Sequence, residues 1–170
     1  MPYLLGAELG GEPRDSARAG YERMNAFLTA AGLDLSQAAQ SDGEGGPGAL
    51  FSARFMTSYL VFLSRQPDFP RFEAALPVLG RDGTLVDTLR ASPMAGKLRA
   101  KTGTYVLGNS LGSGLVVIGK GLAGYMTTAS GRELAFAVFL NHVPTAPDMQ
   151  EVLAVGDTLT EMAEAVYRLR

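Results

Sequence analysis

The chain has 170 residues, 46% of them hydrophobic and 19% charged, and its net charge at pH 7 is -2. This length and composition predict one globular domain and exclude a disordered chain, and the small negative charge gives no footprint for nucleic acid. Because there is no cysteine, disulfides, thiolate metal sites and cysteine nucleophiles are excluded. No apolar run reaches the about 18 residues of a membrane span. The first residues do not resemble a signal peptide.

A helix is predicted near the start of the chain. Asp15 or Ser16 can cap it and Gly32 can stop it. Its apolar positions are Tyr21, Met24, Phe27 and Leu28. Residues 40–50 contain several glycines and a proline, so they are expected to form a loop.

A second helix is predicted to begin after Ser52, which can serve as its N-cap. Pro67 and Pro70 are expected to end this helix, because proline removes a helical hydrogen bond. One face of the helix is apolar and consists of Phe55, Met56, Tyr59, Leu60 and Leu63.

The pattern changes to strands from Leu98 onward. Residues 108–121 contain five glycines around an apolar strand at 115–118, so this segment is expected to be a flexible connection. Strands at 122–128 and 134–141 are joined at Ser130-Gly131, which suits an antiparallel pair. Since residues 134–140 are apolar on both faces, a central strand covered by helices is predicted there.

The last helix is predicted to start near Asp148, with Glu151 completing a capping box. Its apolar residues recur every three or four positions and can pack on the sheet: Val152, Val155, Leu159, Met162, Val166 and Leu169. The elements together predict an α+β fold in which helices pack on an antiparallel sheet.

Lys101-Thr102-Gly103 is the motif with the most chemical content. Residue types alternate along this stretch, so Lys97, Arg99 and Lys101 share one face of a strand. Lys-Thr-Gly is one of three motifs that form the active site of penicillin-binding proteins and serine β-lactamases. The others are Ser-x-x-Lys, which carries the nucleophile, and Ser-Asp-Asn or a variant. Neither of these two occurs in the sequence.

Longer stretches resemble one family, in chain order. Residues 75–85 resemble the segment that precedes Lys-Thr-Gly in D-alanyl-D-alanine carboxypeptidases of the penicillin-binding protein 4 type, peptidase family S13. Residues 122–136 resemble that family's next two strands and their turn, and residues 3–11 resemble the helix after its Ser-x-Asn motif. Of the family's Asp-Gly-Ser-Gly-Leu-Ser loop, the chain keeps only Asp42-Gly43 and Gly45.

The resemblance implies that residues 1–170 are a single domain, the C-terminal portion of a penicillin-binding catalytic domain. Its fold would be a partial β-lactamase/transpeptidase-like fold. Since Tyr3 would follow closely on the family's second motif, the chain is expected to be a truncation, an internal start or one half of a split enzyme.

The resemblance also implies a role for each residue of the motif. The backbone amide of Thr104 would be one of two oxyanion donors, the other coming from the absent serine. Lys101 would supply positive charge, and Thr102 would donate its hydroxyl to the carboxylate of a D-Ala terminus or a β-lactam. Gly103 would let the substrate backbone approach the strand.

Other candidates have plainer interpretations. Without the resemblance, Lys101 would be a solvated strand lysine, and Lys97 and Arg99 are interpreted as a solvated face or fold contacts. His142 is the only histidine, and a general base would fit its chemistry. The family uses no histidine at that place, so a structural role is favoured.

Asp82 and Glu133 could form a carboxylate pair, but nothing in the sequence links them, and Asp82 beside Gly83 is better interpreted as a turn residue. The glycines around Lys120 lack the following Ser or Thr of a phosphate loop. No cluster has metal-ligand spacing, and no cofactor is expected.

The leading hypothesis is a segment of a serine-type D-Ala-D-Ala carboxypeptidase or endopeptidase that acts on peptidoglycan stem peptides through an acyl-enzyme. Without its nucleophile the segment is expected to be inactive alone. One alternative is a non-catalytic D-Ala-D-Ala peptide-binding or scaffold module. Another is a split enzyme whose N-terminal partner chain supplies the nucleophile. The family's substrate implies a periplasmic or other extracytoplasmic location.

Overall fold

The structure is a computed structural model of the 170-residue chain, and it describes residues 2–8, 16–43 and 45–169. The chain forms two compact units, Met1–Tyr59 and Leu60–Arg170. The fold is α+β, with helices and antiparallel sheets, as the sequence predicted. None of the described helices has both the length and the apolar character that a membrane span requires.

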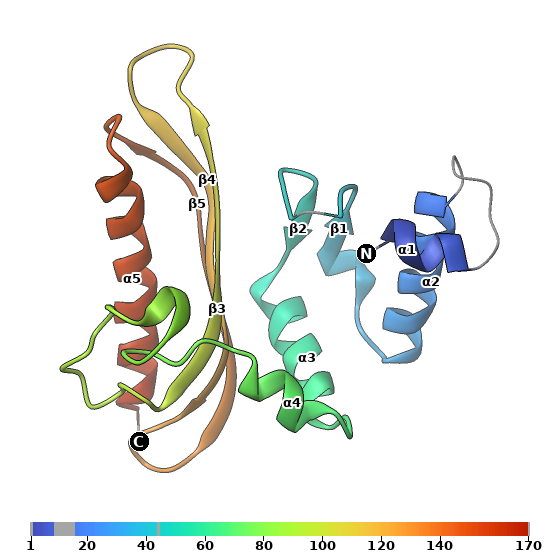
Figure 1. Cartoon of the computed structure of the whole chain (residues 1–170), viewed down its shortest axis with the longest axis horizontal. Helices are drawn as coiled ribbons and strands as arrows, with labels where there is room; N and C mark the ends of the chain where they lie inside the picture. Colours follow the sequence, from blue (N-terminus) through green and yellow to red (C-terminus); the bar gives the residue numbers. More distant parts are fainter. Residues whose placement is uncertain (1, 9–15, 44, 170) are drawn as a thin grey trace. The chain divides into compact units, whose positions relative to one another are not determined.

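The first unit contains helices α1 (Pro2–Glu8) and α2 (Ser16–Ala30) and a small hairpin of strands β1 (Ala38–Gln40) and β2 (Ala49–Phe51) (Figure 1). The two helices approach closely at two glycines, because a Cβ atom at Gly6 or Gly20 would overlap the backbone of the other helix. Helix α2 is the first predicted helix. The proposed capping residue Asp15 lies outside the described residues.

The predicted loop at residues 40–50 is the turn of the β1–β2 hairpin, whose two strands the sequence pattern did not indicate. The carboxylate of Asp42 organises this turn by accepting hydrogen bonds from the backbone amides of Gly45, Gly46 and Gly48. The side chain of Asp42 therefore supplies the hydrogen bonds that hold this turn together.

Helix α3 (Ala53–Ser64) begins where predicted, and Ser52 Oγ accepts a hydrogen bond of 2.9 Å from the amide of Phe55. Helix α3 ends at Ser64, three residues before Pro67, which agrees with the prediction for that proline. The prediction for Pro70 was wrong, because Pro70 lies in the first turn of the next helix, α4 (Phe69–Ala74). A proline is tolerated there because the first amides of a helix have no helical partner to lose.

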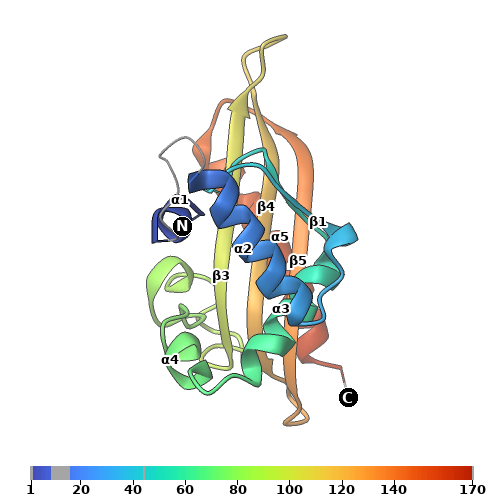
Figure 2. The same cartoon turned by 90° about the vertical axis from the view of Figure 1, so that its right-hand side faces the viewer.

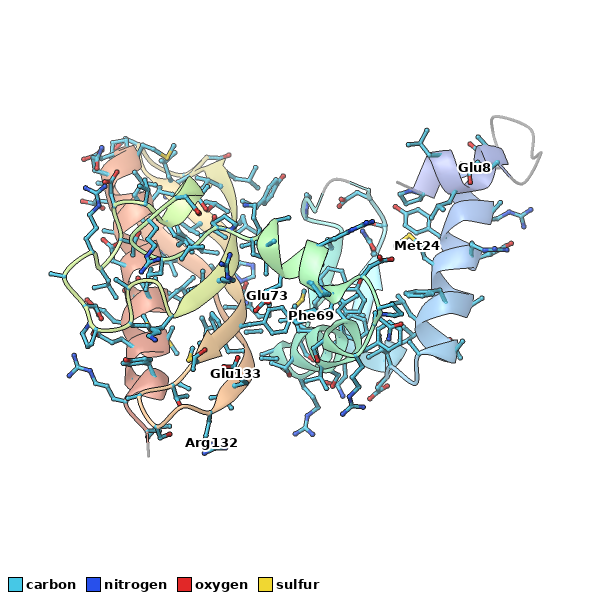
Figure 3. All side chains as sticks on the ribbon, turned by 60° about the horizontal axis from the view of Figure 1, so that its bottom comes forward. Glu8, Met24, Phe69, Glu73, Arg132 and Glu133 are labelled. Carbon is cyan, nitrogen blue, oxygen red and sulfur yellow. The ribbon has the colours of Figure 1, made fainter. Side chains whose placement is uncertain are left out.

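The second unit is organised around a three-stranded antiparallel sheet of order β3–β4–β5, which Figure 2 shows lengthwise: β3 (Leu98–Gly108), β4 (Leu115–Thr127) and β5 (Glu133–Thr145). Helix α5 (Met149–Tyr167) packs on one face of the sheet. The main core is formed by this helix, the sheet and the connection that precedes β3, and it includes Leu79, Leu85, Met94, Leu98, Leu122, Met126, Leu159 and Ala163. On the other face, Tyr125 contacts the ring of Phe69, with 5.0 Å between the ring centroids. Phe69 belongs to α4 and is labelled in Figure 3.

The prediction for residues 108–121 was wrong in extent. Residues 109–114 connect the two strands, and the predicted strand at 115–118 is the start of β4, which continues to Thr127 and includes Gly119 and Gly121. Strand β4 contains a bulge: Tyr105 pairs with Gly119 and Val106 with Val117, which leaves Ile118 without a partner in β3. The predicted turn at Ser130-Gly131 is confirmed, with Gly131 at a φ of 83°.

Strand β5 lies at an edge of the three-stranded sheet among the described residues, and β4 is the central strand. The sequence predicted a central position for β5 because its side chains are apolar on both faces. That pattern reports which faces are covered and carries no information about whether both edges are paired.

The last helix agrees with the prediction in position but not in every contact. Asp148 Oδ1 caps it by accepting from the amide of Gln150, whereas Glu151 bonds the amide of Ala146 instead of closing a capping box. Met162 and Leu169 are 46% and 63% exposed, so they lie outside the buried stripe. Ala163 and Tyr167 take their places, since they lie four and eight positions after the buried Leu159.

Candidate functional site

The outer edge of β3 is paired only over its first residues. The amide of Leu79 donates to the carbonyl of Leu98 and the amide of Ala100 donates to Pro77, each at 3.0 Å. In an antiparallel strand the N–H and C=O groups of every second residue point to the same edge. Residues 102 and 104 therefore present their backbone groups at the edge that Ala100 uses, and no described backbone group pairs with them there.

The open part of this edge coincides with the Lys-Thr-Gly-Thr stretch. Lys101 is exposed and its Nζ donates a 2.7 Å hydrogen bond to the carbonyl of Thr102. Thr102 donates its hydroxyl to Thr84 Oγ1 at 3.1 Å. Thr104 is exposed. Donors of three kinds, an ammonium, hydroxyls and backbone amides, are thus gathered along one short length of strand.

Gly103 has no structural reason to be glycine within the described residues. Its φ is not in the left-handed region, and a Cβ atom there would meet nothing within 4 Å. Gly121, opposite it on β4, differs, because a Cβ atom there would lie 2.7 Å from the ring of Phe139. The space above Gly103 is therefore open to an approaching molecule.

The turn before β3 holds Thr84 next to this edge. The amide of Val78 donates to Asp82 Oδ1 at 2.7 Å, and the amide of Gly80 donates to the carbonyl of Leu85 at 2.9 Å. Gly83 has a φ of 56°, and a Cβ atom there would lie 2.9 Å from Pro77 Cγ. The buried Leu85 anchors the end of the turn. Asp82 is therefore a turn residue, as the sequence indicated.

The remaining candidates from the sequence lie apart from this arrangement of donors. Glu133 accepts from Thr127 Oγ1 at 2.8 Å at the β4–β5 turn, so it does not share a partner with Asp82. His142 is exposed and has a φ of 56°. Arg99 shares a face of β3 with Lys101, whereas Lys97 lies in the turn before the strand begins, so the predicted shared strand face does not include it. The ion pairs of the described residues include none of the three. No group of three possible metal-ligating side chains occurs within the described ranges.

Two residues near the site were missed by the sequence analysis. Thr84 lies within residues 75–85, whose resemblance to the family's segment before Lys-Thr-Gly does not indicate a role for this threonine. Lys120, directly opposite Thr104 in the β3–β4 register, is buried and donates a 2.7 Å hydrogen bond to the carbonyl of Val152 in α5. Burial lowers the pKa of Lys120, and the nearby Asp157 carboxylate partly opposes this shift. A lysine between glycines gives no sequence signal for burial.

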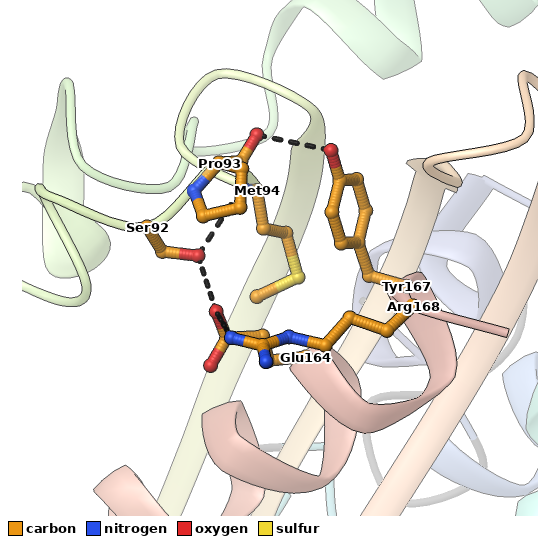
Figure 4. Close-up of polar contacts among 6 residues, drawn as sticks. All are labelled: Ser92, Pro93, Met94, Glu164, Tyr167 and Arg168. Carbon is orange, nitrogen blue, oxygen red and sulfur yellow. Dashed lines mark hydrogen bonds and ion pairs between the residues drawn. The ribbon is translucent and has the colours of Figure 1, made fainter.

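A cluster of polar contacts fixes the connection that leads into β3 (Figure 4). Ser92 Oγ donates to Glu164 Oε1 of α5 at 2.6 Å, and Tyr167 Oη donates to the carbonyl of Pro93 at 3.1 Å. The hydrogen bonds from Ser92 and Arg168 lower the pKa of Glu164. Because Met94 beside them is fully buried, the strand is held in place just before its open edge begins.

Comparisons with known proteins identify a family and similar folds for this chain. The model of the D-Ala-D-Ala carboxypeptidase 3 (S13) family matches residues 5–162. Penicillin binding protein 4 (dacB) from Haemophilus influenzae, solved alone and with a novel β-lactam, is 24% identical, and both structures have a TM-score of 0.69. The matches cover 89% of this chain and 32% or 34% of theirs.

A second similar structure is the predatory endopeptidase Bd0816 from Bdellovibrio bacteriovorus, in complex with immunity protein Bd3460. It is 22% identical with a TM-score of 0.57, and the match covers 88% of this chain and 38% of that one. The chain thus spans about a third of the length of these solved proteins, and the likeness concerns the fold. No curated protein matches the chain.

Proposed function

The chain belongs to the D-Ala-D-Ala carboxypeptidase 3 (S13) family, and we propose that it is the Lys-Thr-Gly-bearing segment of a serine-type D-Ala-D-Ala carboxypeptidase or endopeptidase. Its substrates are the stem peptides of peptidoglycan. In this proposal residues 1–170 are the C-terminal portion of one catalytic domain. One observation carries the proposal: the outer edge of β3 is paired up to Ala100 and open along the motif.

An open strand edge suits an extended peptide substrate. The peptide backbone pairs with the N–H and C=O groups at the edge, as an added strand does. The missing side chain at Gly103 leaves room for this approach. The amide of Thr104 then donates to the carbonyl oxygen on which negative charge develops. One such preorganised donor contributes a factor of about 10²–10³ to kcat.

The side chains of the motif bind the end of the substrate. Thr102 donates its hydroxyl to the terminal carboxylate, and Lys101 supplies a positive charge that favours this anion. In the complete reaction a serine hydroxyl attacks the carbonyl of the D-Ala-D-Ala bond, the terminal D-Ala leaves as an amine, and water releases the acyl group from the serine. The serine belongs to a Ser-x-x-Lys motif, which this sequence does not contain.

According to this proposal the isolated chain binds the substrate but does not hydrolyse it, because a site without its nucleophile can contribute only binding and electrostatic stabilisation. β-Lactams resemble the substrate and occupy the same edge without forming a covalent bond to this chain. Since peptidoglycan lies outside the cytoplasmic membrane, the proposed location is the periplasm or another extracytoplasmic compartment.

Incubation with a fluorescent penicillin tests this proposal, followed by intact-mass analysis. The expected mass is that of the unmodified 17.9 kDa chain. A covalent adduct at a defined serine would contradict the assignment of an absent nucleophile. In parallel, acetyl-D-Ala-D-Ala is titrated while the backbone amides are followed by NMR. The expected changes lie in residues 101–104, and Lys101→Ala weakens them.

The absence of Ser-x-x-Lys supports two further candidates. The chain is either a non-catalytic D-Ala-D-Ala peptide-binding or scaffold module, or one half of a split enzyme whose N-terminal partner chain carries the nucleophile. The two differ in one measurement. A split enzyme regains penicillin acylation when the partner chain is added, whereas a binding module does not.

A further inference from the structure

We infer that Thr84 is a second carboxylate-binding residue of the site, acting beside Thr102 on the terminal carboxylate of the substrate. The inference rests on the proposed function, since it adds a ligand to that same site. Thr84 belongs to the turn before β3, outside the Lys-Thr-Gly motif, and its hydroxyl oxygen lies 3.1 Å from that of Thr102.

The direction of the hydrogen bond between the two hydroxyls leaves a donor free. Thr102 donates its only hydroxyl proton to Thr84 Oγ1. The hydrogen bonds of the described residues give the hydroxyl proton of Thr84 no acceptor, and Thr84 is exposed. A hydroxyl has one proton to donate and two acceptor positions. In the chain without ligand Thr84 therefore accepts from Thr102 and can donate outward. When a carboxylate binds at the open edge, the Thr102 hydroxyl rotates to donate to one carboxylate oxygen and Thr84 donates to the other.

The two hydroxyls suit a carboxylate in particular. A carboxylate has two oxygens that accept hydrogen bonds, and bonds to a charged group are stronger than bonds between neutral groups. Lys101 adds a positive charge on the neighbouring residue, with its Nζ 2.7 Å from the carbonyl of Thr102. The described ion pairs show no acidic partner for Lys101, so its charge is available to an anion.

The turn is built rigidly enough to hold Thr84 in this place. Leu85, the next residue, is buried in the core. Gly83, the preceding residue, takes a left-handed φ of 56°, and a Cβ atom there would also meet Pro77, so only glycine fits this position. Pro77 itself accepts from the amide of Ala100. The turn and the strand are thus joined one residue before the motif begins, which preorganises the hydroxyl of Thr84 before any ligand arrives.

Peptide binding to the 170-residue chain tests the inference. Acetyl-D-Ala-D-Ala and its C-terminal carboxamide are titrated by NMR into the unmodified chain, Thr84→Val, Thr84→Ser and Thr102→Val. Valine keeps the shape of threonine and removes the hydroxyl. The matched control is Thr29→Val, the same change at an exposed residue of α2. Urea unfolding of each variant reports whether the fold is retained.

Loss of the Thr84 hydroxyl is expected to weaken binding of the acid about tenfold, the effect of losing one hydrogen bond to a charged group. Binding of the carboxamide is expected to be unchanged, and Thr84→Ser is expected to restore binding of the acid. The inference is overturned if Thr84→Val weakens both peptides equally, because Thr84 would then only support the strand.

The inference and the proposed function fail differently. If Thr84→Val binds the acid normally while Thr102→Val does not, Thr84 is not a ligand and the proposed site stands. If neither peptide changes the signals of residues 101–104 in the unmodified chain, the proposed site is absent and Thr84 has no carboxylate to bind.

Discussion

The side chain of Lys120 in β4 lies over the helical glycine Gly156 of α5, such that a Cβ atom at Gly156 would come 2.7 Å from Lys120 Cε. Glycine in the middle of a helix costs about 1 kcal/mol relative to alanine. The close approach of Lys120 explains why α5 contains one there. The same lysine donates to the carbonyl of Val152, one turn earlier in α5, so the two residues together set the distance between the helix and the sheet.

Gly156→Ala is therefore expected to destabilise the chain, although alanine is the better helix former. The added methyl must displace a side chain whose Nζ is held by a 2.7 Å hydrogen bond, and overpacking of this kind costs about 1–3 kcal/mol. In a Lys120→Ala background the same change is expected to stabilise by about 1 kcal/mol. Urea unfolding of the unmodified chain, the two single variants and the double variant measures the coupling free energy between Lys120 and Gly156. Equal effects of Gly156→Ala in both backgrounds would show that the two residues do not interact.

The lowered pKa of Lys120 predicts a pH dependence of stability. The unfolded chain keeps the ordinary lysine pKa of 10.5, and the folded pKa is lower because of burial. Between these two pKa values the unfolded chain binds a proton that the folded chain has lost, so the free energy of unfolding rises with pH. Lys120→Met removes this contribution. The difference between the two proteins should grow in favour of the unmodified chain as the pH rises from the lowered folded pKa towards the ordinary lysine pKa of 10.5. A constant difference would contradict a perturbed Lys120.

Gly103→Ala and Gly121→Ala should separate binding from folding. Gly103 meets open space, so its replacement should leave the free energy of unfolding within about 0.5 kcal/mol of that of the unmodified chain. It should nevertheless weaken binding of acetyl-D-Ala-D-Ala, because the methyl group occupies the space that the peptide backbone needs. Gly121→Ala is the matched control, since its methyl would meet the ring of Phe139 and destabilise the fold. Normal peptide binding by Gly103→Ala would argue against a ligand at this edge.

The hydrogen bond between Ser92 and Glu164 should be visible in the titration of the carboxyl group. Ser92 is the first cause of the lowered pKa of Glu164 and Arg168 is the second. Ser92→Ala should therefore raise the pKa of Glu164. Because a depressed carboxyl pKa contributes stability above the unfolded pKa and loses it in acid, this variant should also lose part of its stability near neutral pH. NMR titration of the Glu164 side chain measures the first effect, and Ser64→Ala, remote from Glu164 in sequence and bonded only within α3, serves as the control.

The helices were predictable because their signals are local. The Ser52 cap, the Asp148 cap and the glycine turn at Ser130-Gly131 each depend on a few neighbouring residues, and each was found where expected. The exposed Met162 shows the limit of the same reasoning. A stripe of apolar residues is compatible with more than one helix rotation, and only contact with the sheet selects the one that buries Ala163 and Tyr167.

The sheet was less predictable because its decisive features are not local. The bulge at Ile118 allows a glycine-rich segment to remain in one long strand, and its position depends on the register with β3. The edge position of β5 depends on which strands are present to pair with it. The alternation of side chains along one strand predicts neither its register with a neighbouring strand nor its position at the edge of a sheet.

The sequence by itself determined that this is an α+β chain of the D-Ala-D-Ala carboxypeptidase 3 (S13) family, because the stretches that resemble the family are recognisable from residue types alone. Only the tertiary structure decided that the edge of β3 is open from residue 101 onward and that Thr84 lies beside Thr102. The physical reason is that these contacts join residues 18 or more positions apart, and they exist only once the turn before β3 has packed into the core.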